Sequence, residues 1–130
     1  MDIVVDTSAL LAVIVAEPER DRIVELTSGR TLIGPGSIPW EIGNAFSAMI
    51  KQRRLGLMEA QQGLQIFYTI PLRLVKVDMN NALSIANQTK LYAYDAYVLD
   101  CAIRYSVPLL TLDHGLQRAA RKLGIKLMEA

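Results

Sequence analysis

Apolar residues follow two spacings along this chain, and the spacings predict alternating strands and helices. Short apolar runs predict strands at residues 2–5, 31–33, 72–77 and 107–112, with a last edge strand at 125–127. Apolar residues three and four positions apart predict helices between these runs. The expected helices cover residues 8–15, 18–26, 39–54, 57–68, 79–89 and 115–123, and a further helix carries Asp95 in its first turn.

This alternation predicts an α/β fold with an open, mostly parallel sheet, helices on both faces and right-handed crossovers. At 130 residues and 52% apolar content, the chain is long enough for one compact domain, expected to span residues 1–130. No linker, repeat or low-complexity run interrupts it. The longest apolar stretch, Ala9 to Ala16, is too short for a bilayer span. With no basic leader at the N-terminus, we expect a cytoplasmic protein with no membrane association.

Four acidic residues stand where apolar runs turn into loops or helix starts: Asp6, Glu41, Asp95 and Asp113. In a parallel sheet such positions meet at the carboxyl edge, so we expect the four to converge. Carboxylates in apolar surroundings lose hydration, and none of the four has a neighbouring Lys or Arg to compensate. A shared divalent cation, Mg²⁺ or Mn²⁺, accounts for such a group, since both ions prefer oxygen ligands.

The charges add little to this picture in sum but more in their distribution. A net charge of +1 does not indicate a dedicated polyanion binder. Basic residues nevertheless gather at two places that together suit a phosphate backbone, or that are simply solvated faces. The two groups are Lys51, Arg53 and Arg54, and Arg118, Arg121, Lys122 and Lys126.

The four acids lie in segments that resemble those of PIN-domain proteins, and in particular the small VapC-type toxin ribonucleases of prokaryotic toxin–antitoxin pairs. The segments are Val4 to Leu10, Trp40 to Ala45, Tyr94 to Ala96 with Ala102, and Pro108 to Asp113. They occur in the family's order with similar spacing and cover nearly the whole chain. Four ordered motifs are far more specific than one.

The resemblance implies that Asp6, Glu41, Asp95 and Asp113 are catalytic and hold Mg²⁺, with Mn²⁺ as a possible substitute. It assigns supporting polar positions to Thr7, Asn44 and Thr111. The implied reaction is endonucleolytic hydrolysis of RNA phosphodiesters by metal-activated water, leaving a 5′-phosphate and a 3′-hydroxyl. Whether one or two ions bind is left open.

The same resemblance implies partners beyond the RNA substrate. Toxins of this kind are homodimers and are inhibited by a small cognate antitoxin protein that inserts into the active-site groove. We expect an amphipathic partner to dock on an apolar groove near the second and third helices, at residues 26–50.

Several other residues have ordinary interpretations. Asp100 is expected to be a solvated or ion-paired acid, with a supporting role at the site as the alternative; it lies about 140° around the helix from Asp95. Without a second histidine, His114 does not support a paired-imidazole mechanism and is expected in an exposed turn. Trp40 is expected in core or helix-entry packing rather than base stacking. Cys101 is expected to be a small buried hydrophobe, and Met49, Met58 and Met79 to be interior filler.

Alternative functions remain open from the sequence. Each acid alone is explained by capping a helix or complementing its dipole. A phosphatase of the haloacid dehalogenase type needs a second Asp at position 8, where Ser stands. Residues 34–36 lack the Lys and Ser or Thr of a phosphate-binding loop. The main alternative is a catalytically silent PIN-fold binding or scaffold protein.

Overall fold

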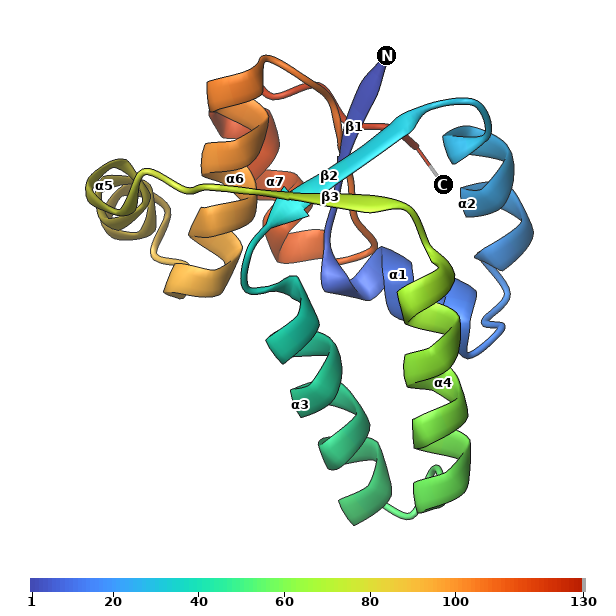
Figure 1. Ribbon diagram of the computed structural model, residues 1–130. Helices are drawn as coiled ribbons and strands as arrows, with labels where there is room; N and C mark the ends of the chain where they lie inside the picture. The colour runs from blue at the N-terminus through green and yellow to red at the C-terminus, as the bar shows by residue number, and fades with distance from the viewer. Residues whose placement is uncertain (130) are drawn as a thin grey trace.

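The computed structural model, which describes residues 1–129, contains a parallel four-stranded sheet in the order β3-β2-β1-β4 (Figure 1). The strands are β1 (Asp2–Val5), β2 (Thr31–Pro35), β3 (Leu72–Val75) and β4 (Leu109–Leu110). The helices are α1 (Thr7–Ile14), α2 (Arg20–Thr27), α3 (Ile38–Lys51), α4 (Leu57–Thr69), α5 (Met79–Thr89), α6 (Ala93–Tyr105) and α7 (His114–Lys122). The predicted α/β class with a parallel sheet is confirmed.

The period of two along the strands divides the core between two helix layers. Ile3 and Val5 of β1 pack into one cluster with α1, α3 and α4, whereas Val4 packs into the other with α5, α6 and α7. The neighbouring β4 follows the same rule, with Leu110 on the first face and Leu109 on the second. Helices therefore cover both faces of the sheet (Figure 1), as the sequence predicted.

The largest difference from the predicted elements concerns the last strand region. Only Leu109 and Leu110 form β4, rather than residues 107–112, because serine and threonine hydroxyls take over the amides that follow. The expected edge strand at 125–127 is reduced to one bridge between Leu109 and Leu127. Elsewhere the boundaries shift by a few residues. The largest of these shifts shortens α3 to Lys51, since Arg53 takes a left-handed φ of 60°.

The helices α3 and α4 form an antiparallel pair that extends away from the sheet (Figure 1). Gly63, in the middle of α4, permits their close approach: a Cβ atom there would lie 2.6 Å from Cζ of Phe46 and 3.3 Å from Cγ2 of Ile14. Phe46 is buried, so its ring has little room to move. In the part of the chain that the structure describes, no helix has the length and apolar character needed to span a membrane.

We expect Gly63→Ala to destabilise the protein by about 1 to 2 kcal/mol, because overpacking against Phe46 outweighs the gain in helix propensity. The matched control is Gly43→Ala in α3, where an added Cβ meets no atom within 4 Å. That variant should gain roughly 0.5 to 1 kcal/mol from propensity alone. Urea unfolding of both variants provides the measurement, and an equal gain in both would contradict tight packing at Gly63.

Candidate active site

Four helices begin at the carboxyl edge of the sheet, and each brings one acidic residue to its N-terminus. Asp6 caps α1 directly after β1, and Asp113 caps α7 shortly after β4. Glu41 and Asp95 lie in the first turns of α3 and α6. Amide groups at helix N-termini favour negative charge, so each carboxylate occupies a position that offsets part of its desolvation.

Two hydroxyl groups join the start of α1 to the start of α7. Ser8 donates to Oδ1 of Asp6 at 2.7 Å and accepts from the amide of Leu112 at 3.0 Å. Thr111 donates to Oδ2 of Asp6 and accepts from the amide of Asp113 at 3.0 Å. Both oxygens of Asp6 are thereby oriented, and the segment carrying Asp113 is tied to the segment carrying Asp6. Thr111, which was predicted to support the site, contacts Asp6 directly, as does Ser8, which was not among the predicted residues.

Glu41 is held in the same manner by two other hydroxyls. Thr7 donates to its Oε1 at 3.1 Å, and Ser37 donates to its Oε2 at 2.6 Å. Thr7 was predicted to support the site, but Ser37 was missed. Its position four residues before Glu41 is a recognisable signal, because such residues share a helix face. Asn44 is exposed and lines the same cavity of about 300 Å³ as Thr7 and Glu41, with Trp40, Ala45 and Tyr94 completing the lining.

Burial and neighbouring charge raise the proton affinity of two of the acids, Asp6 and Asp95. Burial raises the pKa of Asp6 from 3.8 to about 6, with the charge of Asp113 contributing, although the three hydrogen bonds to its carboxylate act in the opposite direction. The pKa of the half-buried Asp95 is also raised, first by desolvation and then by the charges of Asp113 and Glu41. The four carboxylates therefore share one electrostatic environment, although they come from distant parts of the chain.

The donor chemistry of this site suits a hard divalent cation. Carboxylate oxygens are the ligands that Mg²⁺ and Mn²⁺ prefer, and no donor among residues 1–129 hydrogen-bonds the carboxylate of Asp95. No three His, Cys, Asp or Glu side chains in this range are grouped tightly enough to form a ready-made ligand shell. A cation here would have to draw the side chains inward, and its charge would offset the repulsion between carboxylates that opposes this movement.

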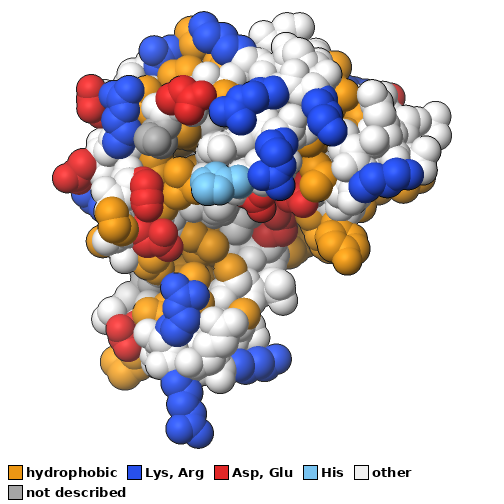
Figure 2. Space-filling view, turned by 180° about the vertical axis from the view of Figure 1, so that it is seen from behind, with side chains coloured by type: hydrophobic (Ala, Val, Ile, Leu, Met, Phe, Trp, Pro, Cys, Tyr) orange, Lys and Arg blue, Asp and Glu red, His pale blue; other side chains and the backbone are white. Residues whose placement is uncertain are grey.

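The two basic groups of the sequence lie at different distances from these acids. Arg118 is on α7, the helix that Asp113 caps. The side chains of Arg118 and Asp113 are neighbours, because a Cβ atom added at Gly115 would lie within 4 Å of both. Lys51, in contrast, ends α3 about 15 Å along the helix axis from Glu41. Figure 2 shows acidic side chains beside the pale-blue histidine, with several Lys and Arg side chains around them. Of the two basic groups, the C-terminal one thus brings Arg118 beside Asp113. His114 is exposed, as predicted, but opens α7 instead of lying in a turn.

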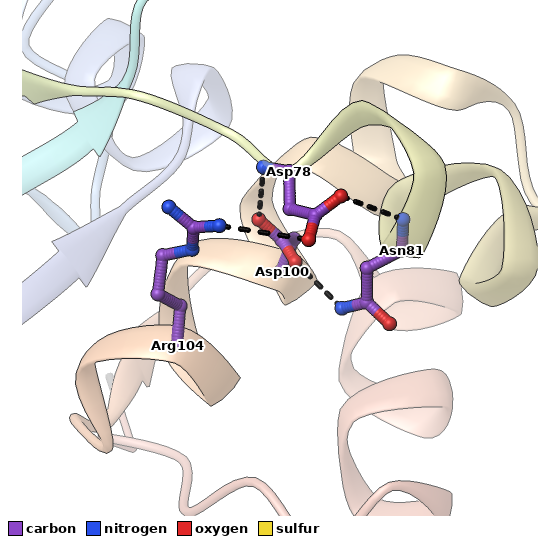
Figure 3. Close-up of polar contacts among 4 residues, drawn as sticks. All are labelled: Asp78, Asn81, Asp100 and Arg104. Atoms are coloured by element: carbon purple, nitrogen blue, oxygen red, sulfur yellow. Dashed lines mark hydrogen bonds and ion pairs between the residues drawn. The ribbon is translucent and has the colours of Figure 1, made fainter.

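Asp100 differs from the expected solvated or ion-paired acid. It is 1% exposed, and its two oxygens accept hydrogen bonds from the amide of Asp78 at 3.0 Å and from Nδ2 of Asn81 at 2.6 Å (Figure 3). Arg104 pairs with Asp78 at 3.6 Å rather than with Asp100. Asp100 thus fastens the start of α5 to α6.

Four further expectations concerned apolar side chains. Trp40 is 76% exposed, so the expectation of core packing was wrong: it follows Pro39 in the first turn of α3, on the face that points away from Ile38 and Ile42. Met58 and Met79 are also exposed because each lies at the start of a helix, outside its buried stripe, whereas Met49 is buried as predicted.

Cys101 is buried as predicted. Burial and the nearby charge of Asp100 raise the pKa of its thiol to about 12. This thiol therefore has no nucleophilic character at neutral pH.

Comparison with known proteins identifies the family. The PIN domain family model matches residues 3–122, and the chain therefore belongs to the PIN domain family. None of the curated proteins matches the chain.

Solved structures similar to this chain share its fold at low sequence identity. PAE2754 from Pyrobaculum aerophilum has a TM-score of 0.74 at 20% identity, over 98% of this chain and 83% of that one. A chain of VapBC2 from Rickettsia felis, crystallised with a DNA fragment from its promoter, has a TM-score of 0.67 at 17% identity, over 98% of both chains. VapC20 from Mycobacterium tuberculosis, a sarcin–ricin loop cleaving toxin, has a TM-score of 0.64 at 15% identity, over 90% of this chain and 94% of that one.

The raised pKa of Asp6 predicts a specific pH dependence of stability in metal-free buffer. Between about pH 4 and pH 6 the folded protein binds a proton that the unfolded chain has released, so Asp6 destabilises the fold as the pH rises through this window. Asp6→Asn removes this loss. Its unfolding free energy should gain about 2 to 3 kcal/mol relative to the unmodified protein across the window.

Urea unfolding at several pH values in the presence of a chelator measures this difference. Asp21→Asn is the matched control, because Asp21 lies exposed on α2 and should leave the pH profile unchanged. Parallel profiles for Asp6→Asn and the unmodified protein would contradict a raised pKa at Asp6.

Proposed function

We propose that this protein is a metal-dependent endoribonuclease that acts as the toxin of a type II toxin–antitoxin pair. The observation that carries the proposal is that Asp6, Glu41, Asp95 and Asp113 all lie at helix N-termini on one edge of the sheet, where burial and then the charge of Asp113 raise the pKa of both Asp6 and Asp95. Membership of the PIN domain family and the similarity of fold to a toxin that cleaves the sarcin–ricin loop support the choice of RNA as substrate.

In this proposal Asp6, Glu41, Asp95 and Asp113 hold Mg²⁺ or Mn²⁺. When bound, such an ion lowers the pKa of a coordinated water and neutralises charge on the phosphate. Ser8 and Thr111 fix the orientation of the Asp6 carboxylate, and Thr7 and Ser37 fix that of Glu41. Asn44 lines the cavity in which the scissile phosphate would lie. Arg118, beside Asp113, supplies positive charge for the adjoining phosphates.

We expect Asp95→Asn to abolish RNA cleavage, with a loss of roughly 100-fold or more, because Asp95 is the carboxylate whose oxygens have no competing donor among residues 1–129.

Thr111→Val should weaken Mn²⁺ binding by about 10- to 100-fold, since it frees the Asp6 carboxylate from its oriented position. Isothermal titration with Mn²⁺ and mapping of cut 5′-ends in RNA measure the two effects.

Thr89→Val is the matched control for Thr111→Val. Thr89 also donates its hydroxyl within the protein, to the carbonyl of Ile85 in α5, but lies outside the acidic site. It should leave metal binding unchanged. A catalytically silent scaffold, the alternative, predicts no Mn²⁺ site of millimolar or better affinity and no effect of Asp6→Asn on function.

The proposed partners follow from the same assignment. A cognate antitoxin protein would inhibit the enzyme, and the toxin itself would form a homodimer in the cytoplasm. An apolar hollow of about 340 Å³ between α3 and α4 falls partly in the predicted docking range, residues 26–50, through Gly43, Phe46, Ser47 and Ile50. Leu57, Ala60 and Leu64 of α4, outside that range, line it as well. We assign this hollow to an apolar side chain of the antitoxin.

Leu57→Glu should therefore weaken antitoxin binding by about 10- to 100-fold, as expected for the loss of one buried leucine side chain from an interface. Met58→Glu is the matched control, because the adjacent Met58 is also exposed but does not line the hollow. Titration of the co-encoded antitoxin measures both affinities. Equal affinities for the two variants, or a parallel loss of Mn²⁺ binding in Leu57→Glu, would refute this placement.

A further inference from the structure

The cavity of about 300 Å³ that Thr7, Glu41 and Asn44 line is called the acidic cavity below. A second and larger hollow adjoins it and has a different chemical character. It has a volume of about 560 Å³ and lies where β2 and β3 end, against the starts of α3, α5 and α6. Its walls are mostly apolar, with Leu74, Val75, Val77 and Met79 among them. The volume lies within the range of about 300 to 1,000 Å³ that is typical of sites for small organic groups.

Two exposed aromatic residues stand between this hollow and the acidic cavity. Trp40 and Tyr94 line both spaces, and they are 76% and 54% exposed. Each is adjacent in sequence to one of the acids, Trp40 to Glu41 and Tyr94 to Asp95. A group that rests on these rings therefore lies next to the place where the carboxylates gather. Exposing aromatic surface costs free energy, and its location at a site mouth indicates a ligand that covers it.

The wall around these rings is built for a flat group. Tyr97 packs edge-on against Tyr94, with ring centroids 5.6 Å apart and an interplanar angle of 85°. This contact limits the movement of the Tyr94 ring, which is nevertheless 54% exposed. Lys76 lines the same hollow, is exposed, and forms no ion pair with any residue of the described chain. Apolar walls, exposed aromatic rings and one cation together match a nucleobase with its attached phosphate.

We propose that Trp40 and Tyr94 form a stacking platform for the RNA base next to the cleaved bond, and that this base enters the hollow between β3 and α6. Lys76 then contacts the phosphate on the far side of that base. The inference rests on the proposed ribonuclease function and adds the subsite that would select a single-stranded, unstacked nucleotide. A duplex would not fit, because its bases are already stacked on one another.

The sequence supplies its own probe, because Trp40 is the only tryptophan. Its fluorescence should be quenched when oligoadenylate or oligouridylate stacks on it, and should hardly change with an abasic ribose-phosphate oligomer of the same length. The abasic oligomer retains the phosphates, so this comparison separates stacking from charge. The RNA is recovered after each titration to establish that it is intact.

Affinities measured by anisotropy of a labelled RNA extend the test to variants. Trp40→Ala and Tyr94→Ala should each weaken binding by about 5- to 100-fold, whereas Trp40→Phe and Tyr94→Phe should retain most of it. Tyr92→Ala is the matched control, because Tyr92 is 87% exposed beside the start of α6 but lines neither space. Circular dichroism monitors folding of each variant.

Equal affinity of the abasic oligomer, or unchanged RNA binding by both alanine variants, would overturn the proposal. Unchanged RNA binding together with weaker antitoxin binding would assign the platform to the antitoxin instead and would also overturn it. Because the titrations measure binding and not cutting, their outcome is independent of the nuclease test. Absence of any metal-dependent RNA cleavage refutes the proposed function. Normal cleavage without quenching of the Trp40 fluorescence by RNA refutes the platform alone.

Discussion

The placement of four carboxylates at helix N-termini on one edge of the sheet is the constraint around which the candidate site is organised. The parallel sheet sends β1, β2 and β4 toward the same edge, and α1, α3 and α7 begin there with Asp6, Glu41 and Asp113. The helix N-termini and four serine and threonine hydroxyls stabilise these charges, but burial and then the charge of Asp113 still raise the pKa of Asp6. Local hydrogen bonds thus hold together an arrangement that electrostatics opposes.

The opposition between hydrogen bonding and the cost of burying these charges explains why the hydroxyl contacts span distant parts of the chain. Ser8 and Thr111 are separated by about a hundred residues in the sequence, and both contact Asp6. Their own hydroxyl oxygens lie 3.3 Å apart. They replace the ladder hydrogen bonds that would have extended β4, so the strand is short where the site needs its side chains. At this point hydroxyl groups that orient the Asp6 carboxylate take the place of strand-to-strand hydrogen bonds, a local departure from regular structure of the kind found at functional sites.

The sequence predicted most of the fold and only part of the site, for identifiable physical reasons. Periodicity located every strand and helix because each element buries one face, as Ile42 and Phe46 do on α3. It misplaced Trp40, since a single aromatic residue in a first turn has no periodic partner to reveal its direction. Ser37 was missed because hydroxyl donors to a carboxylate carry no signal in apolar spacing.

A comparison of two acids on one helix separates structural from functional carboxylates. Asp100 is buried, and amide donors from the start of α5 satisfy both of its oxygens, so it has nothing left to offer a ligand. Asp95, five residues earlier, is half-buried, has no hydrogen-bond donor among residues 1–129, and lies in the field of Asp113 and Glu41. Burial with full satisfaction stabilises a fold, whereas partial burial with repulsion leaves a cost in free energy that protonation or a bound cation relieves. The degree of hydrogen-bond satisfaction, rather than burial, therefore distinguishes Asp95 from Asp100 and supports the proposed role of Asp95 in holding a metal ion.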